Sequence, residues 1–362
     1  MDNATQGALS GGLLMNPSDD IRTCSQCLLP ETFPATDIDH SGQCVYCRDY
    51  RPFQPRGEDA LREKLLSRRG DTYDVVVPFS GGKDSTYALW YASQVLELRT
   101  IAVNYDSGLQ SDFSKENMRV ACERLHVPWV VKTVSWRRQL TMLRSILRIA
   151  ESVDCFFHVC GNCENGIRTA AVSVARDHRV PFILHGDDPL REPSSTAAFT
   201  GSRAFLSKLV KRKRAIPRVA FHLTRYVVNS GLQQAEMGLP LRHCVTRPLR
   251  TARWPDRGAE VVHFYQYVPW DPMSAIRIIK EHAGWKSPQG KDSRFDCRVH
   301  CFGNKHWIQE VGLSNDGFKL SALLRAGLID KKKRIDDESQ IQNHVDEECR
   351  SVIEDLGLHG YR

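Results

Sequence analysis

The sequence predicts an α/β fold built on an open, doubly wound parallel sheet, with a small cysteine-rich segment before it and a mainly helical C-terminal region after it. Between residues 73 and 188, short runs of β-branched residues alternate with longer segments whose apolar residues recur at helical spacing. Strands that alternate with helices pair in parallel through right-handed crossovers. Such a sheet binds ligands at the carboxyl ends of its strands, so we expect the functional residues there.

The elements follow one another in a regular order. The predicted strands are 74–79, 99–105, 128–134 and, with the loop that follows it, 180–188. The predicted helices between them are 84–97, 111–125, 140–150 and 164–178. After residue 188 the chain is basic and interrupted by prolines, and the pattern returns only as helices at 274–282, 304–311 and 318–326. We therefore expect the sheet within residues 61–190.

Composition and charge are those of an ordinary globular enzyme. The chain has 362 residues, of which 41% are hydrophobic and 26% charged, and it has no run of about 18 apolar residues that could span a bilayer. The first residues lack the pattern of a secretory signal, and twelve cysteines without one favour metal or redox sites in a reducing compartment. We expect a cytoplasmic protein with no membrane partner. Basic runs at 208–214 and 331–334 are interpreted as solvated helix faces rather than as nucleic-acid surfaces.

A glycine-containing turn lies between the first predicted strand and the first predicted helix. Its residues are Ser80, Gly81, Gly82, Lys83, Asp84 and Ser85. Two glycines let the backbone approach a phosphate closely, and a helix start offers N–H groups and a favourable dipole to an anion. Lys83 adds a positive charge, and the hydroxyl groups of Ser80 and Ser85 could donate to phosphate oxygens or help to hold magnesium. The turn therefore predicts a nucleotide phosphate site.

Two further segments end predicted strands and are expected beside the same turn. Asp106 follows the second strand, and Gly186 and Asp187 follow the last one. These residues could bind the nucleotide or its magnesium ion, because carboxylates are preferred magnesium ligands. Asp is also an ordinary residue of loops and helix caps, so both interpretations stay open.

The turn resembles the PP-loop family of the adenine nucleotide alpha-hydrolase superfamily, whose signature is Ser-Gly-Gly-x-Asp-Ser after a strand. The resemblance implies a Rossmann-like sheet of the HUP type and an enzyme that cleaves ATP between its α and β phosphates. It also implies that AMP is placed on a substrate oxygen, which a nitrogen or sulfur nucleophile then displaces. On this basis Lys83, Asp84 and Asp187 are expected to be catalytic; the last lies in a segment similar to the Gly-His-Asn-x-x-Asp stretch of tRNA-thiolating relatives.

Four cysteines near the N-terminus have the spacing of a metal site. Cys24 and Cys27 form one Cys-x-x-Cys pair, and Cys44 and Cys47 form a second one. This pattern is typical of a zinc ion held by four thiolates, and zinc could stabilise a segment that has too few apolar residues for a core of its own. An iron-sulfur cluster and four unpaired structural cysteines are the alternatives.

A further Cys-x-x-Cys, formed by Cys160 and Cys163, precedes the last predicted strand. PP-loop sulfurtransferases, which this part of the chain resembles, use such a pair and one later cysteine to hold a 4Fe-4S cluster whose fourth iron stays open for sulfide. The resemblance implies that Cys163 is catalytic and that Cys297 is the third ligand, with Cys301 and Cys244 as alternatives. A redox dithiol, a second zinc site and inert buried cysteines also fit the pattern.

From about residue 20 to residue 335 the chain also resembles the N-acetyl sugar amidotransferases, which use ammonia from a glutaminase partner. The resemblance is carried by the early cysteine pairs, the turn, and the segments 284–285, 290–295 and 320–329. The chain departs from that family in the Cys160/Cys163 pair and in the segment 296–301. Added thiols beside an adenylating loop favour sulfur as the nucleophile.

The leading hypothesis is therefore an ATP-dependent sulfurtransferase that adenylates a carbonyl or amide oxygen of a small-molecule acceptor and replaces it with sulfur. The expected cofactors are ATP, Mg²⁺, Zn²⁺ and a 4Fe-4S cluster, and the expected partners are the acceptor and a sulfide donor. An amidotransferase with a glutaminase partner is the first alternative, tRNA thiolation the second, and a zinc-bearing binding module the last. The chain could act as a homodimer.

The motifs divide the chain into six expected regions. They are a flexible arm (1–20), a zinc-binding segment (21–60), the ATP-binding domain (61–190), a basic and mobile covering segment (191–258), a helical substrate or cluster region (259–335) and a tail (336–362).

Overall fold

The computed structural model describes residues 21–33, 36–153, 159–187, 209–239, 258–288, 295–358 and 361, without the side chains of residues 153–162. The expected arm at 1–20 and much of the expected covering segment lie outside the described residues. The chain divides into two compact units. The cysteine unit consists of Met1–Tyr50 and Asn304–Asn343, and the sheet unit consists of Arg51–Gly303 and His344–Arg362.

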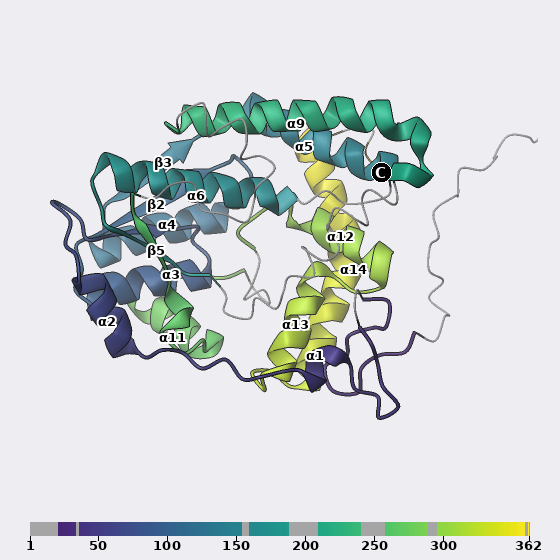
Figure 1. Ribbon diagram of the computed structural model, residues 1–362, viewed down its shortest axis with the longest axis horizontal. Coiled ribbons are helices and arrows are strands. Elements are labelled where there is room, and N and C mark those ends of the chain that lie inside the picture. The colour runs from purple at the N-terminus through teal and green to yellow at the C-terminus, as the bar shows by residue number, and fades with distance from the viewer. Residues whose placement is uncertain are drawn as a thin grey trace, which may run out of the picture. The chain divides into compact units, whose positions relative to one another are not determined.

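The sheet unit contains a five-stranded sheet in which all neighbouring strands are parallel, in the order β3-β2-β1-β4-β5 (Figure 1). The strands are β1 (Val75–Pro78), β2 (Thr100–Asp106), β3 (Trp129–Thr133), β4 (Phe182–His185) and β5 (Glu260–His263). This arrangement confirms the predicted doubly wound α/β fold. The sequence analysis did not predict β5, which is four residues long and follows the stretch where the alternating pattern is lost.

Helices surround the sheet, as Figure 1 shows. Those within the sheet unit are α2 (Glu58–Leu66), α3 (Lys83–Trp90), α4 (Asp112–Leu125), α5 (Trp136–Val153), α6 (Val159–Asp177), α9 (Ile216–Glu236) and α11 (Pro272–His282). Short turns of other helix types are η1 (Tyr91–Val95), η2 (Lys213–Ala215) and η3 (Phe264–Gln266). α9 lies in the basic, proline-interrupted stretch after residue 188, and it packs along α5.

The core of the sheet unit explains the position of the carboxyl edge. β1 is buried at every position, because α6 covers one face of the sheet and α3 packs between β1 and α11 on the other. Val76 and Ile183 from the central strands pack in one cluster with Ala171 and Val174 of α6. The chain leaves β1 toward β2 on one side and reaches β4 on the other. The ends of β1 and β4 therefore form the topological switch point at which doubly wound sheets bind ligands.

The cysteine unit combines N-terminal and C-terminal parts of the chain. It contains α1 (Val45–Arg48), α13 (Asn315–Arg325) and parts of α12 (His300–Val311) and α14 (Lys331–Asp355). Ser314 caps α13 by accepting a hydrogen bond from Gly317 N, and its hydroxyl donates to the buried Glu338 carboxylate. The sequence analysis did not predict α14, whose exposed residues outnumber its buried ones and give a weak apolar pattern.

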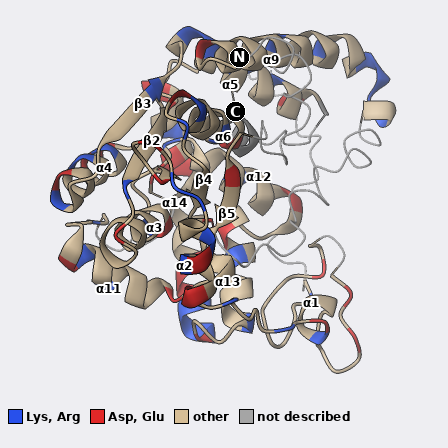
Figure 2. Cartoon of the chain, turned by 60° about the vertical axis from the view of Figure 1, so that its left-hand side comes forward, with Lys and Arg blue, Asp and Glu red and all other residues tan. Residues whose placement is uncertain are grey.

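Charged residues on the described helices are largely paired with neighbours of opposite sign. Figure 2 shows basic and acidic residues interspersed along α4, where Arg119 bridges Glu116 and Glu123. In the basic run at the start of α14, Lys332 and Lys333 pair with acidic residues four positions later, as expected for a solvated helix face. In the part of the chain that the structure describes, none of the helices offers an apolar stretch of membrane-spanning length.

Candidate active site and metal-binding cysteines

The phosphate-type turn, Ser80–Ser85, is held by contacts from two other parts of the sheet unit, which are α4 and the segment after α11. Gly81 has a φ of +75°, and a Cβ at this position would lie 2.3 Å from the carbonyl oxygen of Ser114. Its own carbonyl oxygen accepts hydrogen bonds from Trp285 Nε1 at 2.9 Å and from Asn117 Nδ2 at 3.3 Å. Only glycine fits this left-handed, crowded position without strain. The turn is therefore a preformed structure rather than an unconstrained loop.

Hydroxyl groups inside the turn hold it against the start of α3. Ser80 N donates to Ser85 Oγ, the two hydroxyl oxygens lie 3.3 Å apart, and Ser85 Oγ donates to the carbonyl oxygen of Gly82 at 3.1 Å. Gly82 is the N-cap of α3 and makes no side-chain cap. The first N–H groups of a helix have no acceptor within the helix, so this end of α3 can bind an anion.

Lys83 and Asp84 form an ion pair at the start of α3. Lys83 Nζ lies 2.6 Å from Asp84 Oδ2, with side chains only 11% and 19% exposed. The second oxygen of Asp84 accepts hydrogen bonds from Trp270 Nε1 at 3.0 Å and from the Tyr265 hydroxyl at 3.4 Å. Sequence reasoning missed both aromatic residues. One oxygen of the Asp84 carboxylate is thereby held by Lys83 and the other by the two aromatic side chains, and the Lys83 ammonium is kept near the start of α3.

Gly186 lies close to the turn, whereas Asp106 is engaged locally. A Cβ on Gly186 would lie 2.9 Å from both the carbonyl oxygen of Asp84 and the Cβ of Ala88, so the end of β4 touches the first turns of α3. Asp106 Oδ1 accepts a hydrogen bond from Gly108 N at 2.8 Å, which stabilises the turn after β2. Both residues lie at the carboxyl edge of the sheet, as the sequence predicted.

Asp187 lies between two histidines at the same edge. Asp187 Oδ1 is 3.2 Å from Nδ1 of His185 and 2.9 Å from Nδ1 of His263. Burial alone would raise the pKa of Asp187, but the neighbouring imidazoles of His185 and His263 outweigh it and hold the pKa well below the usual range. Sequence reasoning missed His263, because it belongs to the unpredicted β5 and is brought to Asp187 only by the β4–β5 pairing.

The cysteines assigned to an iron-sulfur cluster are only partly described. The side chains of Cys160 and of the alternative Cys244 lie outside the described residues. Cys163 is half-buried on α6, and its proximity adds to the burial that raises the pKa of Tyr105 in β2. Cys297 pairs with Gln110 just after β2. Cys163 thus lies near Tyr105 of β2, and the backbone of Cys297 pairs with the chain four residues after β2 ends.

The segment of Cys297 also lies beside the phosphate-type turn. Ser111 N donates to the carbonyl oxygen of Asp296, and an Oδ2 atom of Asp296 would lie 3.7 Å from a Cβ on Gly82. Cys301, the other described candidate ligand, forms a hydrogen bond with Cys349 that, together with burial, raises the pKa of Cys301.

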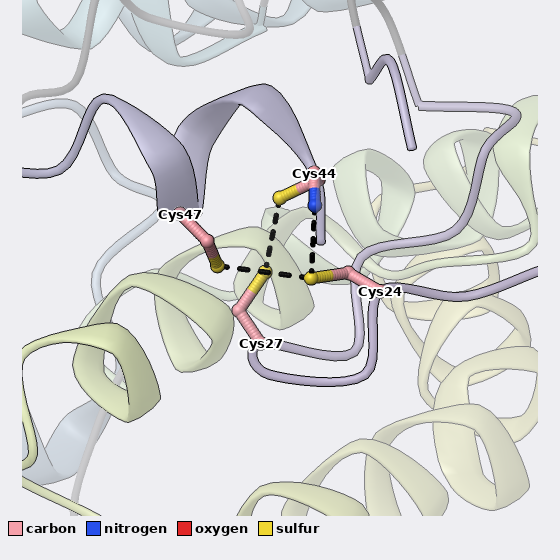
Figure 3. Close-up of side chains that lie close together, drawn as sticks. All are labelled: Cys24, Cys27, Cys44 and Cys47. Carbon is pink, nitrogen blue, oxygen red and sulfur yellow. Dashed lines mark hydrogen bonds between the residues drawn. The ribbon is translucent and has the colours of Figure 1, made fainter. Parts of the chain in front are cut away.

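In the cysteine unit, the four predicted zinc ligands converge on one point (Figure 3). Cys24, Cys27 and Cys44 are fully buried, and the sulfur atoms lie 3.7 Å apart for Cys24 and Cys47 and 3.5 Å apart for Cys27 and Cys44. Hydrogen bonds from Cys27 and Cys47 lower the pKa of the Cys44 thiol, which favours its thiolate form.

The spacing of these sulfur atoms fits a single tetrahedral ion. Four sulfur atoms about 2.3 Å from a central ion lie about 3.8 Å from one another. In a four-iron cluster each thiolate binds a different iron atom, so the four thiolate sulfur atoms must lie farther apart. Here all four sulfur atoms lie within 4.8 Å of one another, which is too close for such a cluster. The four cysteines therefore fit one metal ion, as the spacing of the two Cys-x-x-Cys pairs predicts.

Aromatic side chains supply the apolar support that the knuckle sequence lacks. Phe33 stacks on Phe318 of α13 at 4.8 Å between ring centroids and on Trp307 at 5.7 Å. Arg334 of α14 is buried and donates to the carbonyl oxygen of Leu28, the residue after Cys27. The cysteine segment is therefore stabilised by packing against C-terminal helices as well as by the four converging cysteines.

Comparison with known proteins adds little to this geometry. No family model matches the chain. A curated relative, an uncharacterised protein of Methanocaldococcus jannaschii, is 23% identical over 141 residues, which are 36% of this chain and 50% of the relative, so the chain spans about half the length of that relative. A solved U34-tRNA thiolase of Methanococcus maripaludis with its 4Fe-4S cluster is similar with 12% identity and a TM-score of 0.33, covering 85% of this chain and 86% of that one. At that score the likeness carries no argument about chemistry.

Proposed function

We propose that the chain is a PP-loop enzyme that adenylates an oxygen of a small-molecule acceptor with ATP and then replaces that oxygen with sulfur. The observation that carries this proposal is the Ser80–Ser85 turn, which links β1 to α3 at the switch point of the sheet with Gly81 pinned by Trp285 and Asn117. This preformed turn supports ATP binding because its backbone amide groups are already in place before the phosphates arrive. Little conformational entropy of the turn is therefore lost on binding.

The first step forms a bond between the acceptor oxygen and the α-phosphorus of ATP, and it breaks the bond to the β-phosphate. Negative charge then develops on the departing pyrophosphate. The N–H groups at the start of α3 and the Lys83 ammonium stabilise that charge, together with magnesium. Asp84, oriented by Trp270 and Tyr265, holds the lysine in position. Asp187 follows Gly186, which touches the start of α3, so this carboxylate lies next to the phosphate-type turn.

In the second step sulfur attacks the activated carbon, and AMP leaves with the original oxygen. Support for sulfur comes from Cys163, which lies near Tyr105 of β2, and from Cys297, whose backbone pairs with Gln110 shortly after β2. With Cys160 they would hold a 4Fe-4S cluster, which when bound would supply an open iron for sulfide. Cys163 is the thiol that we assign to the reaction.

A nitrogen transfer reaction is the second candidate. It is supported by Trp285, which belongs to a segment that resembles one in the N-acetyl sugar amidotransferases and donates to the carbonyl oxygen of Gly81. In that case ammonia from a glutaminase partner attacks the same adenylated carbon, and the adenylation chemistry of Lys83 is unchanged.

The experiment that tests the proposal uses the full chain purified without oxygen. The chain is incubated with Mg·ATP, a set of amide-bearing and carbonyl-bearing acceptors, and either sulfide or ammonium. AMP and pyrophosphate are measured, and the acceptor is weighed by mass spectrometry. Release of both products with an oxygen-to-sulfur mass change is expected, and this release is lost in Lys83→Met but kept in Lys280→Met, an exposed lysine of α11. An oxygen-to-nitrogen change instead establishes the second candidate, and release of ADP and phosphate contradicts both.

A further inference from the structure

Three side chains with metal-binding atoms meet beyond the carboxyl ends of β4 and β5. His185 and His263 occupy paired positions in these adjacent parallel strands, so their side chains point to the same face of the sheet. Asp187 follows His185 by two residues and places its carboxylate between the two imidazole rings. Within the described residues, this is the one group besides the four cysteines in which three or more potential ligand atoms lie within 4.8 Å of one another.

The distances within this group are those between ligands of one metal ion. Ligand atoms about 2.1 Å from an ion lie about 3.0 Å apart at right angles and about 3.4 Å apart at the tetrahedral angle. The observed separations from Asp187 Oδ1 are 2.9 Å to His263 Nδ1 and 3.2 Å to His185 Nδ1. The group can therefore close on an ion with small side-chain movements.

We propose that His185, Asp187 and His263 bind a divalent transition-metal ion, distinct from the magnesium that accompanies ATP. Two imidazole nitrogens and one carboxylate suit zinc, iron(II), cobalt(II) or manganese, whereas magnesium and calcium prefer oxygen ligands alone. Metal binding here does not depend on which reaction the enzyme performs, because it rests only on the positions of the three side chains.

The position of the group next to the phosphate-type turn indicates what the ion would contact. Gly186, between two of the ligands, touches the backbone of Asp84 at the start of α3. The side chains of His185 and Asp187 are 18% and 12% exposed, and that of His263 is 31% exposed, so the ligands remain reachable from solvent. Three protein ligands leave coordination positions open for water or for an oxygen atom of a phosphate or acceptor.

The competing account is a purely hydrogen-bonded triad in which both imidazoles donate to the Asp187 carboxylate. It predicts the same short distances without any metal. The two accounts differ in whether the purified chain takes up an ion that has no sulfur ligand, so the test must separate this group from the four cysteines.

Cobalt(II) makes that separation, because cobalt bound to thiolates shows intense charge-transfer absorption and cobalt bound to nitrogen and oxygen shows only weaker ligand-field bands. The full metal-depleted chain is titrated with cobalt(II), and bound metal is counted after gel filtration. We expect thiolate-bound cobalt that is lost in Cys44→Ser, and one further ion without thiolate absorption that is lost in His263→Ala. His282→Ala, a half-exposed histidine of α11 that packs on Trp90, is the matched control and keeps both signals.

Asp187→Asn provides a second variant that preserves side-chain size, and circular dichroism verifies that each variant is folded. We expect at least tenfold weaker binding of the thiolate-free ion in both ligand variants. The proposal is overturned if the wild-type chain binds cobalt only through thiolates. It is equally overturned if folded His263→Ala and Asp187→Asn both keep the thiolate-free ion at wild-type affinity.

Discussion

The four-cysteine group and the edge of the sheet at His185, Asp187 and His263 gather ligands in opposite ways. The cysteine group has four ligands of one kind, three of them completely buried, which leaves no position for a substrate. The sheet-edge group has three ligands of two kinds that stay partly exposed and adjoin the pinned turn. Closed thiolate sites stabilise folds, while open mixed sites support chemistry. In our proposal, the first region stabilises the fold and the second is the reactive one.

The largest effect is expected when a ligand of the closed group is removed. Cys44→Ser should lose the metal ion and destabilise the cysteine unit by several kcal/mol, since binding of a structural zinc ion contributes about 10 kcal/mol or more to folding. Metal analysis and thermal unfolding measure this effect. Cys122→Ala, which removes a buried thiol of α4 outside the group, should keep the metal and cost about 1 kcal/mol. Equal metal content in the two variants would contradict a closed metal site.

The next effect concerns rate rather than stability. Lys83→Met should lower pyrophosphate release by about 10²–10³-fold, because a donor to charge that develops in the transition state is removed. The thermal unfolding midpoint should change little, since Lys83 pairs with a carboxylate that Trp270 and Tyr265 also hold. Wild-type turnover in this variant would contradict the proposed catalytic role of the carboxyl edge of the sheet.

A backbone change tests whether the turn must be preformed. Gly81→Ala places a Cβ against the Ser114 carbonyl oxygen, so ATP affinity should fall at least tenfold. Gly357→Ala is the control, because this glycine also has a positive φ, of +58°, but has open space around its Cβ position. The control should cost about 1–2 kcal/mol and leave ATP affinity unchanged. Calorimetric titration distinguishes the two, and equal affinities would show that crowding at the turn is unimportant.

The amino edge of the same sheet provides the smallest and purely structural effect. Burial would raise the pKa of Asp74, but hydrogen bonds from Arg99 and the charge of Arg69 outweigh it and lower the pKa below its ordinary value of 3.8. A lowered pKa contributes stability that is present above the ordinary pKa and is lost as the pH falls through the folded one.

Asp74→Asn should therefore cost about 1–3 kcal/mol at pH 7, and the difference from wild type should shrink below about pH 4. Urea unfolding of both proteins at pH 7 and below about pH 4 measures this difference in the free energy of unfolding. ATP affinity should be unchanged, and a cost that is the same at both pH values would contradict the charged pairing.

Local patterns predicted the parts of the fold in which the relevant residues are close in sequence. The Ser80–Ser85 turn and both early Cys-x-x-Cys pairs are contiguous motifs, and the structure places them as predicted, between β1 and α3 and around one point. The four predicted strands also lie in runs of apolar residues long enough to be recognised. Such signals depend only on neighbouring residues, so sequence reasoning is effective for them.

Residues that complete each site from a distance could not be predicted in the same way. His263 reaches Asp187 through a four-residue strand whose pairing partner is about 78 positions earlier. Trp270 donates to Asp84 from a segment that carries no motif, and nothing local to Trp285 shows that its indole donates to Gly81. Phe318 packs on Phe33 although the two residues are far apart in the sequence. Tertiary pairing rather than local propensity determines these contacts, and only the folded chain displays them.

The most direct test of the account is a titration of the full chain with Mg·ATP, Mg·ADP and AMP by calorimetry. If the pinned turn is a cradle for the triphosphate, ATP binds at least tenfold more tightly than AMP, and Gly81→Ala abolishes that preference while Gly357→Ala keeps it. Equal affinity for ATP and AMP, or an unchanged preference in folded Gly81→Ala, would contradict the central claim that this turn binds the phosphates of ATP.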